Sequence, residues 1–458
     1  MILSRISFGI ALLFVCLAPC VAQKATPVAV APTKGVILTA ADRTAAIAVM
    51  ARTIQTKYVF PDRVPAIVAR LNDGLASGRY DSVDPWAFAA RVTDDLRDAS
   101  KDRHMYLDYS PDDYAATISD EAHSETGDAG AVDALRTRQA TRTNHGLVAL
   151  RILPGNVRYL KITGFQWIDD RTGAAYDDAM RFLHGGDAVI IDLRGNGGGS
   201  HAAVRYLLSH FMEGDQLDLT FLQAGMAPEQ SHTLDYVPAG RLRHTPLFVL
   251  IDKQVGSAAE AFAYDVQQFK LGTLVGEKTA GAANNNGFTP IAPGFMLSVS
   301  FGRPVHPVSG GNWEGVGVAP DVAVDPERAL PCAQALALKA LATRTDADPA
   351  NRADWAWALP AIEVQLHPVT LLPARMTALV GVYGGRRVVL KDGALRFVGR
   401  DGQSHRLDPL TQDGWFTVDG YDDHLHIRLT GATMEMQWID EPVATTIARD
   451  VDDRAKAQ

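Results

Sequence analysis

From Asn144 onward, short apolar runs alternate with stretches of helical periodicity, and this alternation constrains the fold more than any other feature of the sequence. The apolar runs, for example residues 188–193 and 247–251, are bounded by Gly or Asp, and a helical pattern such as that of residues 258–269 follows. Strands that alternate with helices are typical of an α/β layer domain. The sequence therefore predicts such a domain over residues 144–328.

The regions on either side of this domain have different patterns. Residues 39–110 repeat apolar side chains at helical spacing and predict a helical N-terminal domain, whereas the polar residues 111–143 predict a linker or a covering segment. Residues 329–370 predict a helical connector, with a Trp/Pro linker near residues 355–360. Residues 371–448 alternate short apolar runs with Gly-containing turns and predict a β-rich accessory domain.

The first 22 residues predict a signal peptide, with residues 23–38 as a linker behind it. Arg5 provides a positive start, residues 6–18 are an apolar run too short to span a bilayer comfortably, and Cys20-Val21-Ala22 offers small residues for cleavage. We therefore expect an exported protein, periplasmic or secreted, with no stable membrane insertion after cleavage. An uncleaved anchor and an envelope form lipid-anchored at Cys20 are the alternatives.

Charge and cysteine content limit the partners, disulfides and metal sites that we expect. The formal net charge is -9 and no run of Lys or Arg stands out, so no nucleic-acid partner is expected. Of the three cysteines, Cys16 and Cys20 lie in the signal peptide, which leaves Cys332 without an internal disulfide partner. No Cys-x-x-Cys metal pattern occurs either.

Ser257 stands where a predicted strand turns into a predicted helix. With Glu260 it forms a Ser-x-x-Glu capping box, and this structural role alone accounts for both residues. The same geometry also exposes the hydroxyl beside helix N–H groups that can stabilise an oxyanion. Both interpretations stay open at this point.

Three other segments have a structural and a functional interpretation. Residues 192–200 run from a buried strand into a glycine cluster, which is either a tight connection or a place where a peptide backbone approaches closely. The cluster lacks the last glycine of a dinucleotide fingerprint and a Walker lysine. His104 follows a helix and Glu314 lies in a glycine-rich loop, so each could be an ordinary surface residue.

Together, in this order, the four segments resemble peptidase family S41, which contains the tricorn core, the carboxyl-terminal processing peptidases and the interphotoreceptor retinoid-binding protein modules. Residues 192–199 resemble its glycine loop, residues 256–260 its nucleophile segment and residues 276–281 the strand-loop that follows. Residues 101–104, 153–160 and 312–318 resemble the retinoid-binding branch in particular. The resemblance implies a crotonase-like catalytic domain and a serine peptidase with Ser257 as nucleophile.

The branch decides which base the resemblance implies. The processing peptidases use a lysine beyond the Gly-Glu-Lys-Thr segment, and a gapless comparison places Ala282 there, with Lys278 as a weaker alternative base. The tricorn arrangement uses an upstream His and a downstream Glu, which correspond to His104 and Glu314. Arg103 replaces the serine that precedes the tricorn histidine.

The resemblance thus implies hydrolysis of a peptide or protein substrate by Ser257, His104 and Glu314. The backbone N–H of Ala258, with that of Gly197 or Gly198, would form the oxyanion hole, and no metal or organic cofactor is implied. A non-catalytic module of the same fold that binds hydrophobic ligands or peptides is the alternative. The sequence does not indicate an oligomeric state.

Overall fold

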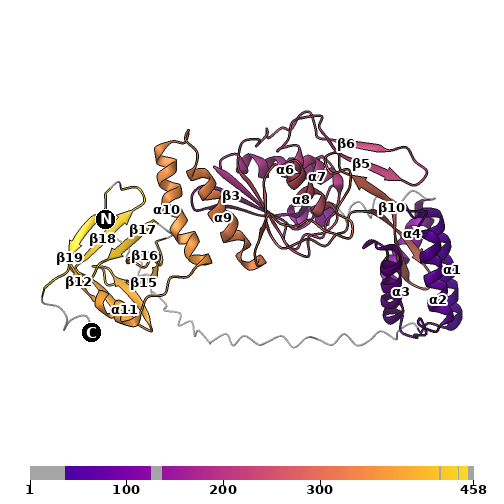
Figure 1. Ribbon diagram of the computed structural model, residues 1–458, viewed down its shortest axis with the longest axis horizontal. Helices are drawn as coiled ribbons and strands as arrows, with labels where there is room; N and C mark the ends of the chain where they lie inside the picture. Colours follow the sequence, from indigo (N-terminus) through magenta and orange to yellow (C-terminus); the bar gives the residue numbers. More distant parts are fainter. Residues whose placement is uncertain (1–36, 125–136, 422–423, 442, 452–458) are drawn as a thin grey trace, which may run out of the picture.

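The structure, a computed structural model, describes residues 37–124, 137–421, 424–441 and 443–451. Three parts follow one another along the chain (Figure 1): a helical part at one end, a central α/β part, and a β-rich part at the other end. The expected signal peptide and most of the expected linker behind it lie outside the described residues.

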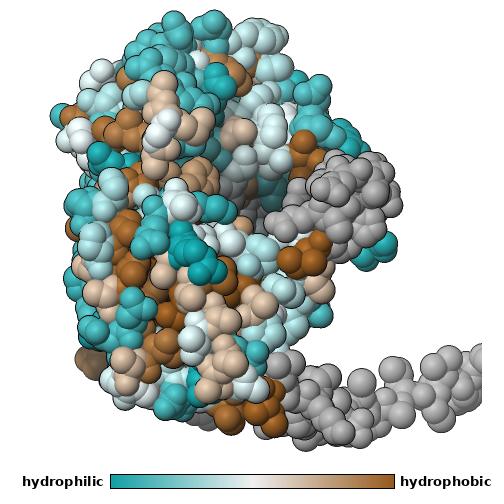
Figure 2. All heavy atoms as spheres, turned by 90° about the vertical axis from the view of Figure 1, so that its right-hand side faces the viewer, coloured by the Kyte–Doolittle hydropathy of each residue, from teal (hydrophilic) through white to brown (hydrophobic). Residues whose placement is uncertain are grey.

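The N-terminal part consists of helices packed on a small sheet. They are α1 (Ala40–Lys57), α2 (Val64–Ala76), α3 (Pro85–Ser100) and α4 (Pro111–Ser124). Apolar residues of α1, α2 and α3 share a buried core with strands β1 (Tyr106–Tyr109), β9 (Asn285–Ile291) and β10 (Phe295–Val305). Figure 2, which looks onto this end, shows mostly polar side chains with several apolar patches between them.

The end of α3 directs the chain toward the centre of the molecule. Asp84 caps the start of this helix, with Pro85 at its first position, and Lys101 ends it in a left-handed conformation (φ 54°). The turn that follows carries Asp102 and His104.

A six-stranded sheet forms the centre, with the strand order β11-β8-β7-β4-β3-β2. All neighbours are parallel except β2 and β3. The bounds are β2 (Leu147–Leu153), β3 (Val157–Ile162), β4 (Ala188–Asp192), β7 (Leu247–Ile251), β8 (Thr273–Gly276) and β11 (Val322–Ala323).

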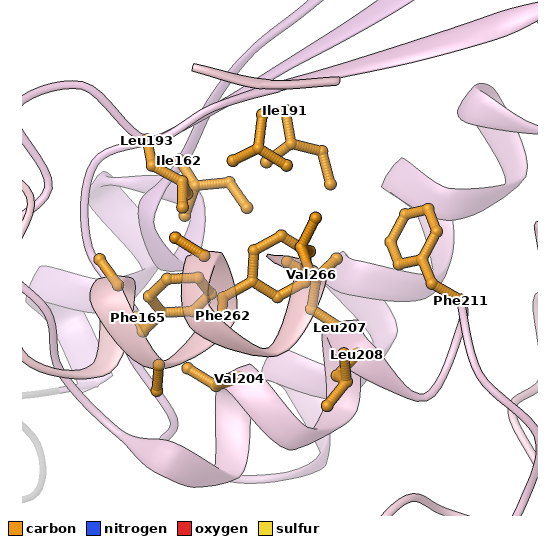
Figure 3. Packing of buried hydrophobic residues seen from close by; sticks show 14 of the residues in the cluster. Ile162, Phe165, Ile191, Leu193, Val204, Leu207, Leu208, Phe211, Phe262 and Val266 are labelled. Atoms are coloured by element: carbon orange, nitrogen blue, oxygen red, sulfur yellow. The ribbon is translucent and has the colours of Figure 1, made fainter. Parts of the chain in front are cut away.

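Helices cover both faces of this sheet, which is why its two central strands, β4 and β7, are apolar except for Asp192 at the end of β4. On one face lie α6 (Asp170–Leu183), α7 (His201–Leu208) and α8 (Ala258–Gln268), and on the other α9 (Pro326–Ala342) and α10 (Pro349–Leu366). Figure 3 shows Ile191 of β4 and Leu193, which directly follows this strand, facing Phe262 and Val266 of α8. The start of α8 is thereby fixed against the sheet.

Strand β10 connects the central part to the helical end. Its first half pairs with β1 and β9, and its last residues pair with β5 (Leu217–Gln223), which pairs in turn with β6 (Glu229–His232). The five strands make one sheet beside the central one. Side chains from the helical part and from the α/β part are therefore held side by side.

The C-terminal part is a barrel-like sheet preceded by α11 (Pro373–Leu379). Its eight strands pair in sequence order, and a bridge between Tyr383 and Arg449 brings the first and last strands together. The strands are β12 (Gly381–Tyr383), β13 (Arg386–Lys391), β14 (Ala394–Val398), β15 (Ser404–Pro409), β16 (Trp415–Val418), β17 (Leu425–Leu429), β18 (Thr433–Trp438) and β19 (Thr445–Ala448).

The α/β class with a helical N-terminal part and a β-rich C-terminal part is confirmed, while the crotonase-like arrangement stays a prediction. The linker expected near residues 355–360 is wrong, because α10 runs through it and buries Trp355, Ala358 and Ile362 on one face. Burial of that face outweighs the low helix propensity of Pro360. Within the described ranges, no helix is long and apolar enough to cross a bilayer.

Candidate active site

Ser257 lies between β7 and α8, at the carboxyl end of the central sheet. Its backbone has φ 52° and ψ -122°, which is a rare conformation for a residue with a side chain. Ala258 begins α8, so its N–H group has no acceptor within the helix. The turn thus presents a hydroxyl next to a helix N-terminus.

The glycine loop follows β4, the neighbour of β7, and is bonded to the nucleophile turn. The Asp252 carboxylate accepts the N–H groups of Gly195 (3.1 Å) and Val255 (3.2 Å), one from each loop. The Gly256 N–H donates to the Asn196 carbonyl at 3.1 Å. These bonds fix the glycine loop against Ser257.

Gly198 makes the closest approach between the two loops. A Cβ atom at this position would lie 2.7 Å from Ser257 Cβ and 3.0 Å from the Ala258 nitrogen, and its φ is +116°. Only glycine fits there without a shift of the backbone. The Gly198 N–H already donates to Asn196 Oδ1 at 2.9 Å, so of the two predicted glycine donors Gly197 is the better candidate for the oxyanion hole.

Glu260 acts as a buried anchor for this turn. Its carboxylate accepts backbone N–H groups from Ser257 (3.0 Å), Gly281 (2.6 Å) and Ala282 (2.8 Å), as well as the Thr279 hydroxyl. Burial raises the pKa of Glu260, and these hydrogen bonds oppose that shift. The bond from Ser257 is the one expected from the predicted capping box, and the bond from Ala282 extends the anchor to the neighbouring loop.

His104 comes from the helical part of the chain and is buried, with 8% of its surface exposed. Its backbone N–H donates to Asp102 Oδ1 at 2.9 Å, and its ring atom Nδ1 lies 3.9 Å from Glu314 Oε2, without a hydrogen bond. Burial lowers the pKa of His104; the charge of Asp102 opposes this shift and that of Arg97 adds to it. The imidazole is therefore neutral near pH 7 and able to accept a proton.

Glu314 is held in place by three backbone N–H groups. Oε1 accepts from Arg103 at 2.9 Å, and Oε2 accepts from Ala283 at 2.6 Å and Asn284 at 2.9 Å. Burial and the charge of Asp102 raise the pKa of Glu314, and the three hydrogen bonds oppose this. Arg103, at the position of the tricorn serine, donates one of these three hydrogen bonds from its backbone N–H.

A cavity opens beside Ser257, between α8 and the strands β5, β9 and β10. Asn284 and Ala283, whose N–H groups hold Glu314, lie in its wall, so the His104–Glu314 pair is close behind this wall. Among the described residues, no hydrogen bond joins the Ser257 hydroxyl to His104. The lining residues are Gly199, His201, Leu219, Phe221, Ser257, Ala258, Ala261, Ala283, Asn284, Asn285, Asn286, Phe301, Pro304 and Trp313.

Lys278, the alternative base, is exposed and does not line this cavity. A lysine must lose much of its hydration before it can act as a base near neutral pH. The surroundings of His104 fit the role of a base better than those of Lys278.

Three residues lie close enough together to be considered as metal ligands. One ligand atom each of Asp102, His104 and Glu314 lies within 4.8 Å of the other two. Both carboxylates already accept several hydrogen bonds from the protein, an arrangement that also suits an acid–histidine pair. The absence of a metal cofactor stays a prediction.

Asp102 and Asn284 were not singled out in the sequence. Asn284 Nδ2 donates to Asp102 Oδ2 at 2.9 Å, and the two residues are 182 positions apart. The sequence signal for Asp102 is its place two residues before His104, where an aspartate can accept the backbone N–H of the second residue after it. Nothing local marks Asn284.

Comparisons with known proteins identify the family of the helical and α/β parts. Residues 156–324 match peptidase family S41, and residues 28–143 match the N-terminal domain of peptidase S41 in eukaryotic IRBP. The C-terminal processing peptidase of Tetradesmus obliquus chloroplasts is 27% identical over 215 residues, which is 43% of this chain and 45% of that protein. Carboxyl-terminal-processing peptidase 3 of Arabidopsis thaliana chloroplasts is 28% identical over 168 residues, 36% of this chain and 31% of that protein.

The chain thus spans less than half the length of the curated relatives that it matches. Among solved structures, a lipoprotein from Streptococcus agalactiae is similar with a TM-score of 0.44 and 15% identity, over 65% of this chain and 96% of that one. Because the two family matches cover the helical and the α/β parts in the expected order, the chain belongs to peptidase family S41.

Proposed function

We propose that the chain is an exported serine-type peptidase that hydrolyses peptide bonds through an acyl-enzyme on Ser257. The carrying observation is that the hydroxyl of Ser257 sits at a helix start against the glycine loop, while a buried neutral His104 and Glu314 lie behind the same cavity. These groups come from three distant stretches of sequence. Family membership supports the same reaction.

In the proposed mechanism, neutral His104 accepts the Ser257 proton while Oγ attacks the carbonyl carbon of the scissile bond. The N–H groups of Ala258 and Gly197 would stabilise the oxyanion. The imidazolium would pass its proton to the leaving amine, and water would then hydrolyse the ester by the reverse sequence. Glu314 would orient the imidazole and stabilise its charged form.

The Ser257–His104 hydrogen bond would have to form when substrate binds. Catalytic hydrogen bonds are often long in structures without substrate and tighten in the complex. Glu314 Oε2 lies 3.9 Å from His104 Nδ1 and is held by backbone N–H groups, so a small movement of the ring toward Glu314 would bring these two atoms within hydrogen-bond distance.

Labelling with a fluorophosphonate probe tests the nucleophile directly. We expect one adduct, on Ser257, in the wild-type protein and in Lys278→Ala, and none in Ser257→Ala. Peptide mapping of the labelled protein by mass spectrometry identifies the modified residue. A folded wild-type protein that neither reacts with the probe nor cleaves peptides would instead be a non-catalytic ligand-binding module of this fold.

Export rests on the apolar run and the small residues before Gln23. N-terminal sequencing of the protein from the periplasm or the medium should give a chain that begins near Gln23. A chain that starts at Met1 in the cytoplasm would contradict export. A mature chain that begins at a lipid-modified Cys20 would indicate an envelope anchor instead.

A further inference from the structure

One buried carboxylate beside His104 has no role in the mechanism described above. Asp102 is 1% exposed and lies in the turn that leads from α3 to β1. Its oxygens accept three donors: the His104 N–H at 2.9 Å, Asn284 Nδ2 at 2.9 Å and the Tyr58 hydroxyl at 3.3 Å.

The hydrogen bonds of Asp102 join three separate segments around the imidazole. Tyr58 ends α1, and Asn284 precedes β9 and donates its backbone N–H to Glu314 at 2.9 Å. The two acids are therefore linked through a single residue, and one ring nitrogen of His104 and one oxygen of each acid lie within 4.8 Å of one another. Neither acid can move away from the ring without breaking bonds to Asn284.

From this geometry we propose that Asp102 is a positioning residue of the peptidase, a second carboxylate that fixes His104 and stabilises the imidazolium formed during acyl transfer. The proposal rests on the proposed function. Glu314 alone would leave a buried imidazolium with one anion at 3.9 Å. Asp102 adds a second carboxylate with an oxygen within 4.8 Å of a ring nitrogen, and a charge so close matters more in a buried site than it would in water.

The charged groups around His104 make the expected effect of Asp102 specific. Asp102 favours the protonated imidazole of His104, whereas Arg97 and burial favour the neutral form. The Glu314 carboxylate lies 3.9 Å from the ring. Removal of the Asp102 charge therefore lowers the pKa of His104 further. A role confined to the shape of the turn would leave that pKa unchanged.

Asp102→Asn tests the charge while it preserves most of the contacts. The new amide oxygen can still accept the His104 N–H, and the Asn284 amide can turn over to present its oxygen to the new NH₂ group. We expect kcat to fall by about 10- to 100-fold with little change in KM, and the acid limb of kcat/KM to move down by about one pH unit or more.

Asp98→Asn is the matched control. Asp98 is an exposed carboxylate near the end of α3, the helix that precedes Asp102, and it is paired with Lys101. Its replacement by Asn changes the net charge by the same amount as Asp102→Asn. The acid limb of kcat/KM of this variant should lie at the same pH as that of the wild type. An Asp102→Asn protein that unfolds at the wild-type temperature and keeps both kcat and the wild-type limb would overturn the proposal.

The measurements distinguish a failure of the Asp102 role from a failure of the peptidase assignment. If wild-type protein shows no peptidase activity and no Ser257 adduct, the peptidase assignment itself fails. If the wild type is active and Asp102→Asn loses kcat without a shift of the limb, Asp102 only shapes the turn. If Asp102→Asn is less thermally stable than the wild type, Asp102→Glu serves as a second variant. It restores the charge and should restore part of kcat.

Discussion

His104→Ala should lower kcat/KM by about 10⁴-fold or more, because the loss of the base removes proton transfer from both chemical steps. Lys278→Ala should lower kcat/KM by about tenfold at most, since Lys278 is exposed and lies outside the cavity that contains Ser257. Steady-state kinetics on a peptide substrate measure both values. Circular dichroism of both variants confirms that each is folded.

The pH profile gives a second measurement of the same assignment. A base works only when it is unprotonated, so activity falls as the pH drops through its pKa. Burial lowers the pKa of His104, and the acid limb of kcat/KM should therefore lie below about 6.5. A limb above neutrality, together with an active His104→Ala and an inactive but folded Lys278→Ala, would assign the base to Lys278.

Gly198→Ala should damage both the catalytic turn and the stability of the protein. The added methyl group would lie 2.7 Å from Ser257 Cβ and 2.8 Å from the Gly256 carbonyl oxygen, at a φ of +116°. We expect kcat/KM to fall by about 10²- to 10³-fold, because the methyl group would displace Ser257 and the N–H of Ala258, the latter a proposed oxyanion-hole donor. The free energy of unfolding should drop by about 1–3 kcal/mol because of backbone strain.

Gly197→Ala is the control for the stability part of this prediction. A Cβ atom at Gly197 would meet nothing within 4 Å, so the unfolding free energy should change by less than about 1 kcal/mol. Urea unfolding measures both variants. Equal stability of the two variants, with full activity for Gly198→Ala, would show that the two loops are not packed as described.

The elements that carry Ser257 could be predicted because their signals are local. The apolar run of β7, the turn at Gly256 and the periodic helix α8 all lie within 22 residues of chain, and the Ser257–Glu260 spacing indicates the cap. The glycine loop after β4 has the same kind of signal. Strands of this type are buried on both faces and show as continuous apolar runs.

Strands β6 and β9 are missing from the predicted strands because their sequences lack these signals, whereas β5 is missing although its residues alternate between apolar and polar. β9 reads Asn-Asn-Gly-Phe-Thr-Pro-Ile, and Gly, Pro and Asn are depleted in strands. It forms nonetheless because it pairs along β10 and shares the core of the N-terminal helices. The link between Asp102 and Asn284 is equally hidden, since only the folded chain brings these two residues together.

If Ser257 and His104 act together as proposed, their origin in two different hydrophobic cores means that both cores must form before the site can react. The turn with His104 is fixed by the core of α1, α2 and α3, and Ser257 by the core of the central sheet. A nascent chain in which only one of these cores has formed has a nucleophile without a base, or a base without a nucleophile. Under the proposed mechanism, such a chain would not hydrolyse the peptide bonds of neighbouring chains before both cores have formed.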